Sequence, residues 1–278
     1  MRLLTEAETY APSGSVVSIG MFDGVHRGHR SVLAQLRAHG QAHGLPTVVV
    51  TFDPHPRAVV TPDRAPALLG SLEQRLALLA ATGAADACLV IRFDQRRSTQ
   101  AVEAFVDDTL LAGLGMRELV VGENFACGHR RKGDVPWLRE AGLSKGFTVS
   151  PVALRPAVEA GSGAACSSTH ARQLLSDGDV ERAAALLGRA HEVLATVMSA
   201  LTGRELAARL PAGMCMPADD DYEGAVADVH TGTWLPAVLQ VRNRVCGVRL
   251  LTRSAQDFAR GCGILLRFHA RRTQAAAA

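Results

Sequence analysis

The first half of the sequence alternates between short apolar runs and segments whose apolar residues follow a helical period. Residues 16–19 form an apolar run, and residues 31–39 place their apolar side chains as on one face of a helix. Residues 46–52, PTVVVTF, are apolar at most positions, which is typical of a strand buried on both faces of a parallel sheet. The alternation continues with SLEQRLALLAATG as a helix, ACLVIRF as a strand, STQAVEAFVDDTLLAGLG as a helix and ELVVGENF as a strand.

Strands that alternate with helices in this way predict βαβ units. Such units build an α/β fold in which helices cover both faces of a doubly wound parallel sheet. Ligands of these folds bind beyond the carboxyl ends of the strands. The glycine-rich and polar segments of this half follow its predicted strands, so we expect the functional site at that edge of the sheet.

The second half has a different pattern. A helical segment, DVERAAALLG, is followed by a periodic segment over residues 194–210 and by the strand-like runs GAVADV, LPAVLQV, GVRLL and GILLRF. We therefore expect a first domain over residues 1–192 and a small β-rich domain over residues 193–278. The segment MPADDDYEG is expected to be an acidic turn, and its residues Asp219, Asp220 and Asp221 favour a solvated turn over a metal site.

Composition narrows the class of partner. The chain has 278 residues and a formal net charge of +3, and its 30 Lys and Arg residues are scattered along the sequence. Scattered positive charge argues against a nucleic-acid partner and favours an anionic small molecule bound in one place. No uncharged apolar run approaches the roughly 20 residues that cross a bilayer, so we expect no membrane insertion.

The cysteines indicate the cellular compartment. All six are widely separated, without a CxxC pair, and the N-terminus has no secretory signal pattern. These features predict a reduced, cytoplasmic protein. The sequence carries no signature of an oligomeric state.

Residues 20–29, GMFDGVHRGH, concentrate glycines and histidines between a predicted strand and a predicted helix. The backbone N–H groups and the positive end of the helix dipole favour an anion at such a junction. Gly20, Gly24 and Gly28 allow close approach of the backbone, and His26 and His29 can each donate a hydrogen bond to a phosphate oxygen. In isolation, the segment fits a glycine-rich turn with solvated histidines equally well.

Five segments in a fixed order carry a resemblance to a known family. They are SIGMFDGVHRGHRSVL, TFDPHP, SLEQRLALL, VVGENFACGHRRKGD and CSSTHARQLLSDGDVERAAALLG. Together they resemble the prokaryotic FAD synthetases, the FMN adenylyltransferase module of bifunctional riboflavin kinase/FAD synthetases in the HxGH nucleotidyltransferase superfamily. The resemblance implies transfer of AMP from ATP to a phosphomonoester, by default FMN, with release of pyrophosphate.

The resemblance also implies roles for individual residues. Its catalytic positions fall on His26, His29, Asn124 and Arg172. Its nucleotide-binding positions fall on Gly20, Phe22, Asp23, Gly24, Gly28, Ser167, Ser168 and Thr169, and its acceptor side falls on His55, Pro56, Val60, Phe125 and Cys127. ATP is expected to bind with Mg²⁺ bridging its phosphates, although no acidic cluster indicates a metal site built by the protein itself.

Two acceptor positions depart from the family pattern. The family usually has an aromatic ring, commonly Phe, at the positions that Val60 and Cys127 occupy here, and those rings enclose the isoalloxazine of FMN. Stacking on one aromatic face is worth roughly 1–3 kcal/mol per ring, by analogy with nucleobases. Loss of both rings predicts weaker binding of FMN, or a different acceptor.

The second half also departs from its bifunctional relatives. It faintly resembles their riboflavin kinase barrel but contains no PTAN segment, and no carboxylate occupies residues 246–248, where the family has its catalytic glutamate. Phosphoryl transfer to riboflavin needs both the residues that hold ATP and a base for the hydroxyl proton. We therefore expect a shortened barrel without kinase activity.

Three functions fit these observations. The first is transfer of AMP from ATP to FMN, and the second is the same chemistry on another phosphorylated metabolite, with ATP or another nucleoside triphosphate as donor. The third is a regulator that binds nucleotide without catalysis. The intact HxGH segment, Asn124 and the SSTHAR segment argue against the third function.

Overall fold

The computed structural model describes residues 1–6, 8–10, 13–153, 156, 165–200, 203–229, 231–252 and 258–272. The chain divides into two compact units. The N-terminal unit comprises Met1–Pro66 and Leu72–Arg155, and the C-terminal unit comprises Ala67–Ser71 and Pro156–Ala278. None of the helices in the described ranges combines the length and the apolar character needed to cross a membrane.

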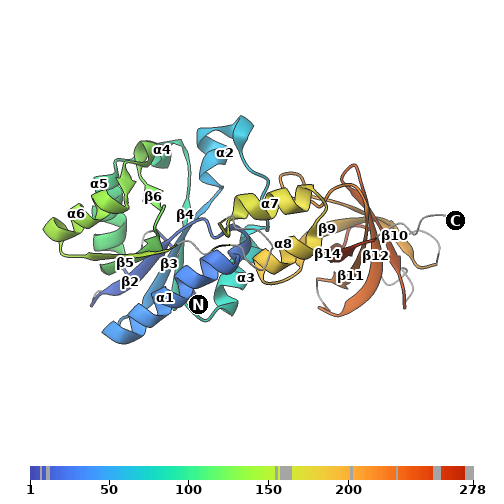
Figure 1. Ribbon diagram of the computed structural model, residues 1–278, viewed down its shortest axis with the longest axis horizontal. Helices are drawn as coiled ribbons and strands as arrows, with labels where there is room; N and C mark the ends of the chain where they lie inside the picture. The colour runs from blue at the N-terminus through green and yellow to red at the C-terminus, as the bar shows by residue number, and fades with distance from the viewer. Residues whose placement is uncertain are drawn as a thin grey trace. The chain divides into compact units, whose positions relative to one another are not determined.

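A six-stranded parallel sheet forms the centre of the N-terminal unit (Figure 1). Its strands lie in the order β1-β4-β3-β2-β5-β8, and each neighbouring pair is parallel. Strand β2 is buried at every position because both faces of the sheet are covered. The strands are β1 (Arg2–Leu4), β2 (Ser15–Ile19), β3 (Thr47–Asp53), β4 (Ala87–Arg92), β5 (Met116–Gly122) and β8 (Thr148–Val152).

Helices cover both faces of this sheet. Helices α1 (Arg27–His43) and α3 (Leu72–Ala81) pack their leucines on one face. Helix α5 (Val102–Ala104), the π-helix η3 (Phe105–Gly113) and α6 (Val135–Lys145) pack on the other face. Shorter elements complete the unit: η1 (Asp23–Val25), α2 (Pro56–Val60), η2 (Pro62–Arg64), α4 (Gln95–Ser98), β6 (Ala126–Cys127), η4 (His129–Arg131) and β7 (Gly133–Asp134).

The connections change face between two neighbouring strands. Strand β2 leads into α1 on one face, whereas β5 leads towards α6 on the other face. These two strands pair directly, with Val17 opposite Leu119. Such a switch point is where open α/β sheets bind their ligands, beyond the carboxyl ends of the strands. The fold therefore places GMFDGVHRGH, which follows β2, and ENFACG, which follows β5, at the two strand ends of the switch point.

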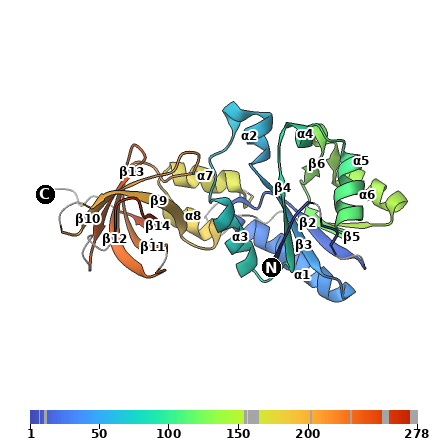
Figure 2. The ribbon, with the colours of Figure 1, turned by 180° about the vertical axis from the view of Figure 1, so that it is seen from behind.

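The C-terminal unit is a closed antiparallel barrel with two helices (Figure 2). The barrel order is β10-β13-β12-β11-β14-β9. Residues of both helices and of the barrel strands share one hydrophobic core, with Tyr222 and Phe268 among its largest buried side chains. The elements are α7 (Ser168–Ser176), α8 (Val180–Leu187), β9 (His191–Ala200), β10 (Glu205–Arg209), β11 (Asp221–Asp228), β12 (Trp234–Arg242), β13 (Val245–Leu250) and β14 (Gly263–Arg271).

The predicted fold class is confirmed, with three differences in detail. The periodic segment over residues 194–210 consists of β9 and β10 with a connection between them. The acidic turn is shorter than expected because β11 begins at Asp221, whose carboxylate accepts hydrogen bonds from Gln240 and Arg242. Asp220 pairs with Arg271, so this segment is held by ion pairs and is not a freely solvated turn. Strands β1 and β8 were not expected from the sequence.

Gly224 is required by close packing between β11 and β14. A Cβ atom there would lie 2.3 Å from the backbone oxygen of Arg267, whereas a Cβ atom on Gly247 would find its nearest neighbour at 3.5 Å. We expect Gly224→Ala to lower the free energy of unfolding of the C-terminal unit by about 1–3 kcal/mol. The control Gly247→Ala should change it by less than about 1 kcal/mol. Urea unfolding reported by Trp234 fluorescence, in a Trp137→Phe background, measures both, and equal effects would contradict the packing argument.

Candidate active site

The loop between β2 and α1 has a strained and buried backbone. Phe22, Gly24 and Val25 have positive φ angles of 49°, 76° and 39°. All three are buried, as is Asp23 between them, which is 3% exposed. A positive φ angle costs a non-glycine residue on the order of 1–3 kcal/mol and persists only where the surrounding structure imposes it. The strained backbone therefore follows the carboxyl end of β2, at the switch point of the sheet.

His26 ends this loop and caps α1. Its Nδ1 accepts a hydrogen bond of 3.2 Å from the backbone N–H of His29. The neutral ring therefore carries its proton on Nε2, which makes that nitrogen a hydrogen-bond donor. His26 is only 5% exposed, so burial and capping together fix the orientation of the ring.

The predicted residues of this segment form one packed cluster. The rings of His26 and His29 stack with centroids 3.6 Å apart and planes 18° apart. The ring of Phe22 meets His29 edge-on, with centroids 5.3 Å apart. Gly20 leaves room for this ring, because a Cβ atom there would lie 3.1 Å from Cε2 of Phe22. Gly28 follows in the first turn of α1, so the cluster sits at the positive end of the helix dipole.

Arg75 anchors the loop from α3. Its Nη1 donates a 3.0 Å hydrogen bond to the carbonyl oxygen of Met21, and its Nη2 lies 3.4 Å from Oδ1 of Asp53. The same Met21 oxygen accepts a second hydrogen bond, of 3.2 Å, from Oγ1 of Thr51. Burial lowers the pKa of Arg75, and the carboxylates of Asp53 and Asp23 oppose that effect. The strained loop is thus tied to both β3 and α3.

Sequence reasoning did not assign a role to Arg75. It occurs within SLEQRLALL, one of the five family segments, and lies four residues before Leu79, which is 1% exposed. Residues four apart lie on the same face of a helix. A charged residue on the apolar face of a helix was the signal that this side chain has a specific buried partner.

A second histidine caps a helix at the end of the neighbouring strand. Nδ1 of His55 accepts a 3.1 Å hydrogen bond from the backbone N–H of Arg57, and Pro56 takes the first position of α2. As with His26, the neutral ring carries its proton on Nε2. Because β2 and β3 are parallel neighbours, both capped helices begin at the same edge of the sheet. The structure thus places two imidazole donors at neighbouring strand ends.

The two positions that depart from the family pattern have different surroundings. Val60, at the end of α2, is 58% exposed. Cys127 lies in β6 opposite Gly133 of β7, and its thiol points to the Gly133 carbonyl oxygen at 3.7 Å. Burial raises the pKa of the Cys127 thiol to about 12, so the group stays neutral. Val60 faces solvent, whereas Cys127 is packed within its hairpin.

The other residues predicted in the N-terminal unit follow β5. Asn124 is exposed in the turn after this strand, and its backbone oxygen accepts a 3.4 Å hydrogen bond from Nη2 of Arg131. Phe125 is half-buried and packs against the core on the α6 face of the sheet. The amide side chain of Asn124 therefore lies at the strand end next to that of β2.

The remaining predicted residues belong to the C-terminal unit. Ser167 caps α7 by accepting a 3.2 Å hydrogen bond from the backbone N–H of His170. Ser168 and Thr169 take the first two positions of that helix. Arg172 donates a 2.6 Å hydrogen bond from Nε to the carbonyl oxygen of Ala67. Within this unit, hydroxyl groups, a helix N-terminus and a guanidinium group therefore occur together on α7.

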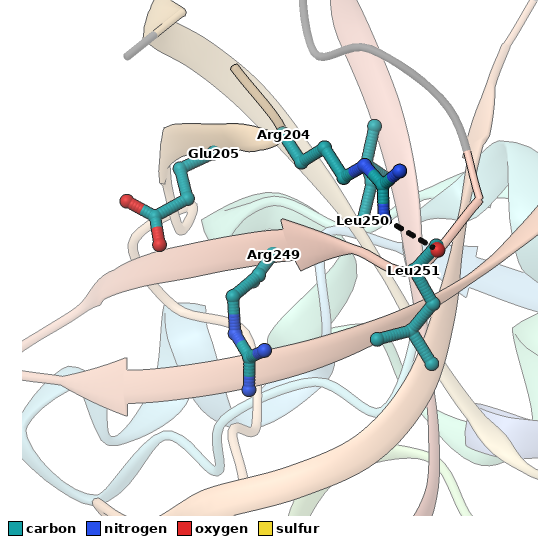
Figure 3. A pocket seen from close by; sticks show the side chains of 5 residues that line it. All are labelled: Arg204, Glu205, Arg249, Leu250 and Leu251. Carbon is teal, nitrogen blue, oxygen red and sulfur yellow. Dashed lines mark hydrogen bonds between the residues drawn. The ribbon is translucent and has the colours of Figure 1, made fainter. Parts of the chain in front are cut away.

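A hollow of about 370 Å³ lies on the barrel (Figure 3). Nη1 of Arg204 donates a 3.1 Å hydrogen bond to the carbonyl oxygen of Leu251 there. None of the residues predicted from the sequence to act in catalysis or binding contributes to it. It is lined by Arg204, Glu205, Arg249, Leu250 and Leu251.

Comparison with known proteins agrees with the motifs. A family model described as FAD synthetase matches residues 8–169. The chain is 41% identical over 197 residues to a bifunctional riboflavin kinase/FMN adenylyltransferase of Pseudomonas fluorescens, covering 71% of this chain and 60% of that protein. It is 38% identical over 175 residues to the protein of the same name from Escherichia coli K12, covering 63% of this chain and 54% of that protein. The matches thus span little more than half the length of these relatives.

A solved structure has a similar fold along almost the whole chain. It is a crystal structure of a macrolide-efflux protein from Streptococcus pneumoniae, with a TM-score of 0.77 and 21% sequence identity. The match covers 99% of this chain and 93% of that one. At this level of identity the likeness concerns the fold alone.

Proposed function

Because the chain belongs to the FAD synthetase family, we propose that it is a nucleotidyltransferase that moves AMP from ATP to FMN, releasing pyrophosphate and forming FAD. The observation that carries the proposal is the stacked pair of His26 and His29 at the N-terminus of α1, 3.6 Å apart between ring centroids. This pair lies at the switch point of the sheet, where such folds bind ligands.

In the proposed reaction, a phosphate oxygen of FMN attacks the α-phosphorus of ATP. The new P–O bond forms as the bond from the α-phosphorus to the oxygen that bridges to the β-phosphate breaks, and pyrophosphate leaves. Negative charge grows on the phosphate oxygens, so oriented donors can lower the barrier without a covalent intermediate. The fixed Nε2 donor of His26, the ring of His29 and the positive end of α1 suit this role.

The other predicted residues have complementary roles in this proposal. Asn124 offers a neutral amide that hydrogen-bonds an anionic oxygen without repelling it. The N-terminus of α7, with Ser168 and Arg172, is proposed to bind the departing pyrophosphate. Mg²⁺ is proposed to enter bound to ATP as part of the substrate. We propose that residues 1–192 carry this activity, with α7 and α8 contributing from the C-terminal unit, and that residues 193–278, which hold most of the barrel, form a domain that takes no part in it.

Removal of one side chain that donates a hydrogen bond to a phosphate group tests the proposed roles. We expect His29→Ala and Arg172→Ala each to lower kcat for pyrophosphate release by roughly 100-fold or more, because each removes a transition-state donor. His269→Ala and Arg92→Ala, which alter exposed residues of β14 and β4, serve as controls and should leave kcat unchanged. Near-normal pyrophosphate release in a folded His29→Ala variant would contradict the assignment.

A second candidate acceptor is a phosphorylated metabolite other than FMN. The observation in its favour is that neither family ring position offers an aromatic face. Val60 is exposed and has an aliphatic side chain, and the thiol of Cys127 points to the Gly133 carbonyl oxygen. Restoring a ring is practical only at Val60, because Cys127 is enclosed, with Gly133 and Val102 packed closely beside it.

The variant Val60→Phe separates the two acceptors. If FMN stacks against α2, the added ring should lower the Kd for FMN at least about fivefold, and Val60→Leu, which adds bulk without a ring, should not. Quenching of FMN fluorescence measures the Kd of the native protein and of both variants. Micromolar or tighter binding of FMN by the unmodified protein would remove the second candidate. Weak binding by all three proteins would instead favour an acceptor without a flavin.

We also propose that the barrel has no riboflavin kinase activity. The segment that replaces the family's glutamate position lies in β13, where Cys246 and Val248 are 0% and 1% exposed and Gly247 lacks a side chain. No carboxylate in this segment can take a proton from a riboflavin hydroxyl.

Riboflavin should therefore remain unconverted when it is incubated with the protein, ATP and Mg²⁺. Separation of the flavins by chromatography measures the outcome, with a no-enzyme sample as the control. Formation of FMN above that control would refute the loss of the kinase.

A further inference from the structure

Two histidines and a glutamate meet at the end of α1 that is remote from the candidate active site. His39 and His43 are four residues apart and therefore lie on one face of α1. Nδ1 of His39 lies 2.8 Å from Oε1 of Glu118, and Nε2 of His43 lies 3.0 Å from Oε2. Within the described part of the chain, this is the group of His, Cys, Asp and Glu side chains whose spacing suits a metal ion.

Glu118 is buried, so the charge of its carboxylate needs a partner. It is 5% exposed and lies two residues before Val120 in β5, on the sheet face that packs against α1. Its ion pairs among the described residues are those with His39 and His43. Ser150 of the neighbouring strand β8 donates a 2.5 Å hydrogen bond to Oε1 and so orients the carboxylate. A buried carboxylate is costly unless a cation or several hydrogen bonds compensate it.

The geometry of the donor atoms suits a small transition-metal ion. The three ligand atoms all lie within 4.8 Å of one another. Tetrahedral coordination at the usual Zn–N and Zn–O lengths places neighbouring ligand atoms about 3.3 Å apart. The 2.8 and 3.0 Å contacts join the two imidazole nitrogens to different oxygens of the carboxylate, so the exposed rings would have to shift for both nitrogens and one or both oxygens to share an ion. The side chains of His39 and His43 are 32% and 53% exposed, so the rings have room to move and water can supply the fourth ligand.

We propose that His39, His43 and Glu118 bind one divalent transition-metal ion, with Zn²⁺ as the best match to two imidazoles and a carboxylate. Magnesium prefers an oxygen shell and would not take this site. The ion would fasten the C-terminal end of α1 to β5. The ten residues from His29 to His39 correspond to about 15 Å along the helix, so the site is structural and separate from the proposed chemistry.

Titration of the full chain with Zn²⁺, after removal of any affinity tag, tests the proposal directly. We expect one ion per chain with a Kd in the micromolar range or below by competition with a chromophoric chelator. The double variant His39→Asn/His43→Asn should bind at least about 100-fold more weakly, because it loses two ligands. His269→Asn, on an exposed barrel histidine, should bind like the native protein.

Glu118→Gln provides a variant that keeps the shape of the side chain and its hydrogen bond with Ser150. It should weaken Zn²⁺ binding about 10-fold or more. The native protein, but not the double histidine variant, should gain thermal stability from Zn²⁺. The absorption spectrum of the Co²⁺-loaded protein should lack thiolate charge-transfer bands, since no cysteine belongs to the site.

The proposal would be overturned if the native protein failed to bind Zn²⁺, or if the double variant and Glu118→Gln both bound it as tightly as the native protein does. The cluster would then be an ordinary set of His–Glu ion pairs. Neither ATP nor FMN takes part in these measurements. Their outcome is therefore independent of the proposed transferase activity.

Discussion

Two hydrogen bonds to the carbonyl oxygen of Met21 hold the loop on which the candidate site depends. Arg75 and Thr51 supply them from α3 and β3. The residues that follow adopt positive φ at Phe22 and Val25, which an unsupported chain would avoid. Because this loop ends at His26, the anchor determines where α1 starts and how its first turn faces a ligand.

The same arrangement recurs at the next strand and gives the site its chemical character. His26 and His55 both use Nδ1 to cap the helix that follows a parallel strand, so both present Nε2 as a donor. These are neutral or cationic donors at helix N-termini, without a nucleophile or a carboxylate cluster among the predicted catalytic residues. That chemistry suits transfer between phosphates by positioning and charge stabilisation.

Sequence reasoning succeeded where burial imposes a simple pattern. Strands β2, β3, β4 and β5 are apolar runs because helices cover both faces of the sheet, and the alternation of strands and helices along the chain predicted the α/β class. Strands β1 and β8 were missed because β1 has three residues at the sheet edge and β8 contains Pro151. Short edge strands carry too few apolar residues to give a period.

Contacts between distant segments were beyond sequence reasoning. The role of Arg75 depends on the fold bringing α3 beside the β2–α1 loop. The enclosure of Cys127 depends on its hairpin with Gly133, and the His39, His43 and Glu118 cluster depends on α1 crossing β5. Motif order located the site, while three-dimensional packing determined which side chains are fixed within it.

The central claim is that the AMP part of ATP is transferred to an acceptor phosphate. The most direct test incubates the protein with Mg²⁺ and FMN, using ATP labelled at either the α- or the γ-phosphate. The account predicts that the α label enters FAD and the γ label enters pyrophosphate, with neither appearing as free orthophosphate. Transfer of the γ label to the flavin, or release of labelled orthophosphate without FAD, would contradict it.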